Sequence, residues 1–234
     1  MPNHCGNNLE ISADPKNKES LKQLKDFVKK SIVKNEKEDA CEDLTFTFQG
    51  VVPMPKELDI PSPARDEYED QALANIKKYG YSDWYEWRHA NWGTKWDAYD
   101  DYIGENLKDF VCMSFDTAWA PPIPYYEALA AKYPLLTIEV DYYESGCDFA
   151  GKQFYEEGIL IDEEEMTYGK WEFLENNDSW WEWKAEQAEE GDLGDLDDFK
   201  EHYGDIWEIM NDKDKKDIKK LIKSYKNEEA NSES

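Results

Sequence analysis

The sequence has few of the residues and spacings from which catalytic and metal sites are usually recognised. Its 234 residues include three histidines and four cysteines, without a C-x-x-C pair, an H-x-x-x-H spacing or an H-E-x-x-H motif. Glycine-rich phosphate-binding loops and the G-x-S-x-G loop of serine hydrolases are missing too. The sequence therefore predicts no catalytic residue, no metal site and no cofactor, and it favours a protein that is not an enzyme.

Long apolar runs are also missing. No stretch approaches the roughly 18 consecutive apolar residues of a membrane span, and the N-terminus has no basic segment followed by an apolar run. The isolated cysteines favour a reduced protein over a disulfide scaffold. We therefore expect a cytoplasmic protein without membrane contact.

Basic residues are scarce relative to acidic ones. The chain has 27 lysines and arginines against 54 aspartates and glutamates, which gives a formal net charge of −27. Such a charge opposes direct binding to nucleic acid or to anionic lipid. It favours a protein partner with a basic or nucleic-acid-binding surface.

Alternating and helical patterns follow one another in the first part of the chain. Period-two alternation predicts strands at residues 8–12, 44–48, 110–117 and 135–143. Apolar residues at three- and four-residue steps predict helices at about 20–32 and 124–133. This βαββαβ order is typical of an α+β ferredoxin-like sandwich, with an antiparallel sheet and both helices on one face. We expect this domain to span residues 1–161, with an insertion at about 55–92 and a hairpin at 149–161 that extends the sheet.

Residues 162–226 differ in composition from the preceding part of the chain. Between Asp162 and Asp212 the sequence holds nineteen acidic and three basic residues, a net charge of −16. Tryptophans and other large apolar residues recur in this tract, so it has enough apolar surface to fold, unlike a plain acidic tail. We expect an acidic, tryptophan-rich, mostly helical extension, followed by a disordered tail at 227–234.

The carboxylates of this extension form a candidate partner-binding surface. Regularly spaced carboxylates on a folded frame can imitate the phosphates of a nucleic acid and occupy the binding groove of a basic partner. A solvated acidic face without a partner is the alternative. The predicted contact residues are Glu186, Glu189, Glu190, Asp192, Asp195, Asp197, Asp198 and Glu201.

A second candidate site lies in the aromatic run from Asn91 to Asp97. One interpretation is an aromatic-walled pocket that stacks a nucleotide or another planar ligand, with Lys95 meeting a phosphate or carboxylate. The structural interpretation places the tryptophans in the core, with Lys95 extended over apolar surface or paired with Asp97. The predicted ligand-binding residues are Trp92, Lys95, Trp96, Asp97 and Trp119.

Four motifs together resemble one protein family. They are Met-Pro-Asn-x-Cys-x-Asn at the N-terminus, Pro53-Met54-Pro55, the run from Trp92 to Asp97, and the run from Phe115 to Pro122. In this order they resemble the YubB-type, or Api92-like, ferredoxin-like family of phages, plasmids and other bacterial mobile elements. The resemblance covers about residues 1–160. It implies a ferredoxin-like fold and a bacterial host cytoplasm, and it implies no mechanism.

Two functions fit these patterns. The first is a non-enzymatic interaction protein that binds a host or competitor protein through its acidic surface, with a nucleic-acid mimic or anti-defence inhibitor as its sharpest form. The second is a small-molecule-binding, nucleotide-binding or enzymatic domain that uses the aromatic run.

Overall fold

A computed structural model describes residues 3–35, 44–190 and 193–232. The chain forms two compact units, residues 1–165 and residues 166–234. Among the described residues, no helix combines the length and the apolar character that crossing a membrane requires.

The first unit alternates strands and helices. Its elements are β1 (His4–Ala13), α1 (Lys18–Ser31), β2 (Ile32–Lys34), β3 (Leu44–Phe46), the 3-10 turns η1 (Phe48–Gly50), η2 (Lys56–Leu58) and η3 (Asp66–Tyr68), α2 (Glu69–Tyr79), α3 (Trp84–Asn91), β4 (Tyr99–Asn106), β5 (Phe110–Ala118), α4 (Ile123–Lys132), β6 (Leu136–Glu144), β7 (Phe149–Glu156) and β8 (Ile159–Met166).

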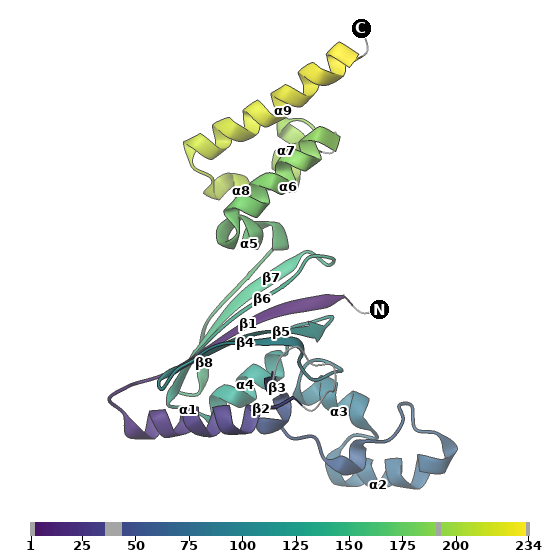
Figure 1. The fold of residues 1–234 in the computed structure, drawn as a ribbon. Helices are drawn as coiled ribbons and strands as arrows, with labels where there is room; N and C mark the ends of the chain where they lie inside the picture. The colour runs from purple at the N-terminus through teal and green to yellow at the C-terminus, as the bar shows by residue number, and fades with distance from the viewer. Residues whose placement is uncertain (1–2, 36–43, 191–192, 233–234) are drawn as a thin grey trace. The chain divides into compact units, whose positions relative to one another are not determined.

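A six-stranded sheet in the order β4-β5-β1-β6-β7-β8 organises this unit. β1 pairs antiparallel with β5 on one side and with β6 on the other, and β4 pairs antiparallel with β5. β1, α1, β4, β5, α4 and β6 therefore make the βαββαβ unit of a ferredoxin-like domain, and β7 and β8 extend its sheet. Figure 1 shows α1 and α4 on the same face of this sheet. The predicted fold class is confirmed.

The second strand of the βαββαβ unit differs from its prediction. Residues 44–48 were expected to form it, but β3 pairs with β2 in a separate two-stranded sheet, and β4 takes the place in the main sheet. The insertion therefore covers everything between α1 and β4, which is more than residues 55–92. β4 is an edge strand with Asp100, Asp101 and Glu105, and its pairing with β5 shifts register twice. Charges and bulges at a sheet edge discourage edge-to-edge pairing, and they also remove the alternation by which a strand is recognised.

The covered face of the sheet packs on an aromatic core. Phe48 in η1 lies with its ring centroid 4.3 Å from that of Tyr125 in α4 and 5.7 Å from that of Phe115 in β5. Trp92 packs edge-on against Phe48 at 5.7 Å. Because Phe48 and Trp92 both belong to the insertion, the insertion completes the core of the domain.

The second unit is helical. Its elements are α5 (Tyr168–Glu175), α6 (Asn177–Glu190), α7 (Leu196–His202), α8 (Gly204–Ile209) and α9 (Asp212–Ser232). Trp180, Phe199, Ile206 and Ile218 are buried in a core of its own. This core explains how so acidic a tract folds. The tail expected at 227–234 overlaps the end of α9, whose backbone is helical to Ser232, and residues 233–234 lie outside the described residues.

A lysine lies inside this second core. The side chain of Lys184 is fully buried, and its ammonium lies 3.5 Å from the ring centroid of Trp183 and 3.6 Å from that of Tyr203. It also donates a hydrogen bond of 2.7 Å to Gln187 Oε1. A cation over aromatic faces gains more when it is desolvated, so the rings offset part of the burial penalty of this charge.

Candidate functional site

The face of the sheet opposite α1 and α4 carries polar side chains in cross-strand rows. One row runs from Cys112 in β5 through Glu10 in β1 and Glu139 in β6 to Phe154 in β7. The next row places Asp141 of β6 opposite Lys152 of β7. Successive residues of a strand point to opposite faces, so these side chains alternate with the buried ones of the covered face. We call this the open face.

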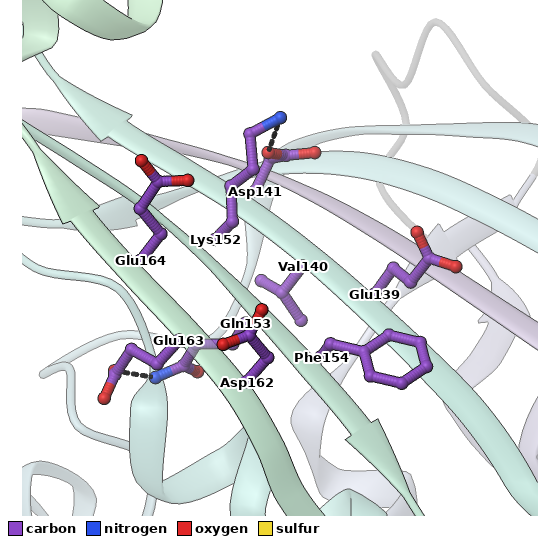
Figure 2. A pocket seen from close by; sticks show the side chains of 9 residues that line it. All are labelled: Glu139, Val140, Asp141, Lys152, Gln153, Phe154, Asp162, Glu163 and Glu164. Carbon is purple, nitrogen blue, oxygen red and sulfur yellow. Dashed lines mark hydrogen bonds and ion pairs between the residues drawn. The ribbon is translucent and has the colours of Figure 1, made fainter.

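A groove of about 230 Å³ lies on β6, β7 and β8. Five carboxylates and one lysine are among the nine residues that line it, and Phe154 supplies a partly exposed aromatic ring. The lining residues are Glu139, Val140, Asp141, Lys152, Gln153, Phe154, Asp162, Glu163 and Glu164. Figure 2 shows how these side chains lie around the groove.

Two interactions organise the groove. Lys152 Nζ lies 3.3 Å from Asp141 Oδ1, so the one cation of the groove is already paired (Figure 2). Gln153 Nε2 donates a 2.6 Å hydrogen bond to Glu163 Oε1, which ties β7 to β8. Glu139 and Asp162 are exposed, and the described residues show no ion pair for either of them. The groove is therefore strongly negative and has an aromatic side.

Part of the charge on the open face destabilises the sheet. Glu10 lies directly opposite Glu139 on the neighbouring strand, and both are exposed. Like charges directly opposite each other destabilise a sheet. The acidity of this face therefore has no explanation in the stability of the sheet itself.

The aromatic run separates into buried and exposed residues. Trp92 is completely buried and donates from Nε1 to the Val52 carbonyl oxygen at 2.9 Å. Asp97 is partly buried, and its carboxylate accepts hydrogen bonds from Phe48 N and from Thr47 Oγ1, both at 2.7 Å. Burial raises the pKa of Asp97, and these hydrogen bonds partly offset the rise. Trp92 and Asp97 are thus structural residues, and their prediction as ligand contacts is corrected.

Three residues of the predicted aromatic pocket remain at the surface. Trp96 and Trp119 are 39% and 48% exposed. Lys95 Nζ lies 4.1 Å above the Trp96 ring and does not pair with Asp97 in the described structure. Trp119 has a φ of 74°, a left-handed conformation that is uncommon for a bulky side chain. These three residues do not share a pocket with Trp92, whose ring lies in the core.

The predicted acidic residues of the second unit also have different roles. Asp195 and Asp198 form a capping box at the start of α7 and so stabilise its N-terminus. Asp197 lies 3.5 Å from Lys200, while Glu186 and Glu201 are exposed. The side chains of Glu189 and Glu190, and all of Asp192, lie outside the described residues.

Sequence reasoning did not single out the residues of the groove. The alternation at 135–143 predicts β6 from its apolar residues, and Glu139 and Asp141 lie on the opposite face of that strand. The signal that was available is the same alternation, since the polar partners of a half-buried strand share one face. That these two residues meet Lys152 and Phe154 follows only from the pairing of β6 with β7.

Comparisons with known proteins agree with this architecture. Residues 91–192 match the family model described as the ferredoxin-like domain in Api92-like protein. The uncharacterized protein YubB of Escherichia coli (strain K12) is 32% identical over 95 residues, which cover 40% of this chain and 63% of that protein. The match therefore spans less than two thirds of that relative's own length.

A solved structure is similar in outline. The crystal structure of the protein Api92 from Yersinia pseudotuberculosis superimposes with a TM-score of 0.40 at 9% identity, covering 70% of this chain and 98% of that one. A likeness at this level carries no conclusion about function. The family model over residues 91–192 and the relative YubB thus support the resemblance of this chain to the YubB-type, Api92-like ferredoxin-like family.

Proposed function

We propose that this protein is a non-enzymatic interaction protein, and that its groove on the open face binds a basic segment of a partner protein. The observation that supports the proposal is the groove itself, whose lining combines five carboxylates, a single, already paired lysine and an aromatic ring. In this proposal the residues of the groove bind the partner and catalyse no reaction.

The chemistry of the groove suits an arginine or lysine side chain. A guanidinium can stack on the ring of Phe154 and at the same time donate hydrogen bonds to the carboxylates of Glu139 and Asp162. These groups come from neighbouring strands, and Glu139 lies directly opposite Phe154. A basic segment that runs across β6, β7 and β8 would therefore meet a ring and carboxylates together.

The partner that we propose is a nucleic-acid-binding protein of the bacterial host or of a competing mobile element. An acidic surface steers association with a basic groove and competes there with the phosphates of DNA or RNA. In this proposal the chain acts in the bacterial cytoplasm, on behalf of a phage or plasmid, as a nucleic-acid mimic or anti-defence inhibitor. It binds neither nucleic acid nor membrane itself.

The test is a pull-down from a bacterial lysate with the full chain as bait, at low and at high salt. Three double charge reversals are compared: Glu139→Lys with Asp162→Lys in the groove, Glu186→Lys with Glu201→Lys on the second unit, and Glu67→Lys with Glu69→Lys in the insertion. All six positions are exposed, and each pair changes the net charge equally. Captured proteins are then assayed for DNA binding with and without the wild-type chain.

We expect the groove variant to lose a specific partner that the insertion variant keeps, and high salt to release that partner. The wild-type chain should displace DNA from it. Capture that survives in the groove variant or at high salt contradicts the proposal. Loss in the second-unit variant alone would move the binding surface to Glu186 and Glu201.

A second candidate function rests on the exposed part of the aromatic run. Lys95 stacked on Trp96, with Trp119 held in a left-handed conformation, could bind a planar anionic ligand. Quenching of tryptophan fluorescence by nucleotides, lost in Trp96→Ala, is the expected result for this function. A Trp96→Ala variant that is quenched like the wild type excludes it.

A further inference from the structure

One imidazole and two carboxylates meet on the open face, toward the opposite edge of the sheet from the groove, where β4, β5 and β1 are neighbours. His4 begins β1, Asp100 lies in β4 and Asp116 lies in β5. One ligand atom from each of them lies within 4.8 Å of the others. His4 Nδ1 and Asp116 Oδ2 are 3.4 Å apart. His4 and Asp100 are exposed and Asp116 is partly exposed, so the cluster is open to solvent.

The irregular pairing of β4 with β5 brings Asp100 to this place. Tyr99 lies opposite Asp116, and the register then shifts before Tyr102. Within the shift, Asp100 has a φ of 47°, in the left-handed region. A β-bulge changes the direction of a side chain relative to regular pairing, and here the carboxylate ends beside that of Asp116.

The distances fit a small cation with nitrogen and oxygen ligands. Two ligands about 2.1 Å from a tetrahedral ion lie about 3.4 Å apart, which matches the separation of His4 Nδ1 and Asp116 Oδ2. Asp100 comes from an exposed edge strand and needs only a small movement to complete the set. The Tyr99 hydroxyl, 3.2 Å from His4 Nδ1, adds a polar group beside the ion.

The charges point in the same direction. Asp100 and Asp116 place two carboxylates close together on a chain whose net charge is already −27. A divalent cation between them replaces their mutual repulsion with attraction to both. The imidazole distinguishes this cluster from the many all-carboxylate surfaces of the protein, because imidazole suits zinc and other transition metals whereas carboxylates alone suit calcium and magnesium.

We propose that His4, Asp100 and Asp116 bind one divalent transition-metal ion, with water in its remaining coordination positions. The sequence predicted no such site because its three histidines are far apart and none has a second ligand at a metal-binding spacing. The site is independent of the groove, and it uses none of the residues that line it.

The experiment titrates the full chain with Zn²⁺ by calorimetry at high ionic strength, where diffuse binding to the acidic surface is screened. Ca²⁺ is titrated as the comparison ion. His4→Ala and Asp116→Asn remove ligands, and Glu105→Gln is the matched control, since Glu105 is an exposed carboxylate on the same strand as Asp100. Circular dichroism without metal confirms that each variant folds.

We expect one Zn²⁺ per chain, little Ca²⁺ binding, and a loss of at least about tenfold in Zn²⁺ affinity in both ligand variants. Glu105→Gln should bind like the wild type. Zn²⁺ should also change the NMR chemical shifts of the His4 ring nitrogens. This measurement detects binding at the site even in a variant of altered stability. Equal binding of Ca²⁺, unchanged affinity in His4→Ala, or an equal loss in Glu105→Gln would overturn the proposal.

Discussion

The two faces of the sheet are made by alternate residues of the same strands, yet they have opposite chemistry. In β1, Leu9 and Ile11 are completely buried on the covered face, while Asn8 and Glu10, which alternate with them, are exposed on the open face. The covered face packs on aromatic rings from α4 and the insertion. The open face holds a negative groove, a like-charge pair and the His4 cluster. Residues that specify the fold and residues available for binding are thus separated by a single step along a strand.

The largest expected effect comes from breaking the covered face. Trp92→Ala removes a fully buried ring packed against Phe48, and it should lower the free energy of unfolding by about 3–5 kcal/mol. Trp96→Ala, in the same run but on the surface, should cost less than about 1 kcal/mol. Chemical denaturation of both variants, followed by circular dichroism, measures the difference. Equal losses would show that the division of the run into core and surface is wrong.

A smaller effect is expected from Asp97, whose carboxylate holds the insertion. Asp97→Ala leaves Phe48 N and Thr47 Oγ1 without their acceptor and should destabilise the protein by about 1–3 kcal/mol. Asp59→Ala, at an exposed carboxylate of the insertion, is the control and should stay within about 0.5 kcal/mol. The same denaturation experiment decides between them.

The open face should respond in the opposite direction. Glu139→Lys turns the pair with Glu10 from repulsive to attractive, so it should raise the free energy of unfolding by about 0.2–1 kcal/mol. The same change should weaken partner binding, because it reverses a charge in the groove. A variant that loses both stability and binding would mean that Glu139 supports the fold, and the contrast between the faces would fail.

The smallest effect concerns pH. Burial raises the pKa of the Asp97 carboxyl above 3.8, so the folded protein holds this proton more tightly than the unfolded chain. The stability linked to it is complete below the unfolded pKa and is lost as the pH rises through the folded pKa. The asparagine of an Asp97→Asn variant does not titrate in this range. The difference in free energy of unfolding between the wild type and Asp97→Asn should therefore become smaller as the pH rises above about 4. A deficit that is constant with pH, in thermal unfolding at several pH values, contradicts this.

Much of the fold was predictable because the central strands alternate cleanly. β5 and β6 were placed within a few residues, and the order of elements gave the fold class. β4 was not predicted as a strand, because its edge position tolerates Asp100, Asp101 and Glu105, and these residues remove the alternation of polar and apolar residues. Residues 44–46 do form a strand. The sheet that this strand joins is set by its pairing with another strand, and local alternation in the sequence does not predict that pairing.

The candidate sites were harder to predict for the same reason. Glu139 and Phe154 become neighbours only through the register of β6 with β7, and His4 and Asp116 only through β1 and β5. The aromatic run was a candidate binding site because of its density of tryptophan, and such density is as typical of core packing as of ligand binding. Its buried half, Trp92 and Asp97, shows that a conspicuous motif can lock a loop onto a core.

The outermost strand, β8, has a consequence for how this protein behaves at high concentration. Its first residues, Ile159, Leu160 and Ile161, are exposed on the edge strand of the sheet, and at such edges strands of other molecules can add and start aggregation. Four carboxylates, residues 162–165, follow them directly. They act as gatekeepers, because a second copy of the same strand would bring its own four charges alongside. The acidity that we assign to partner binding thus also keeps the molecules apart from one another.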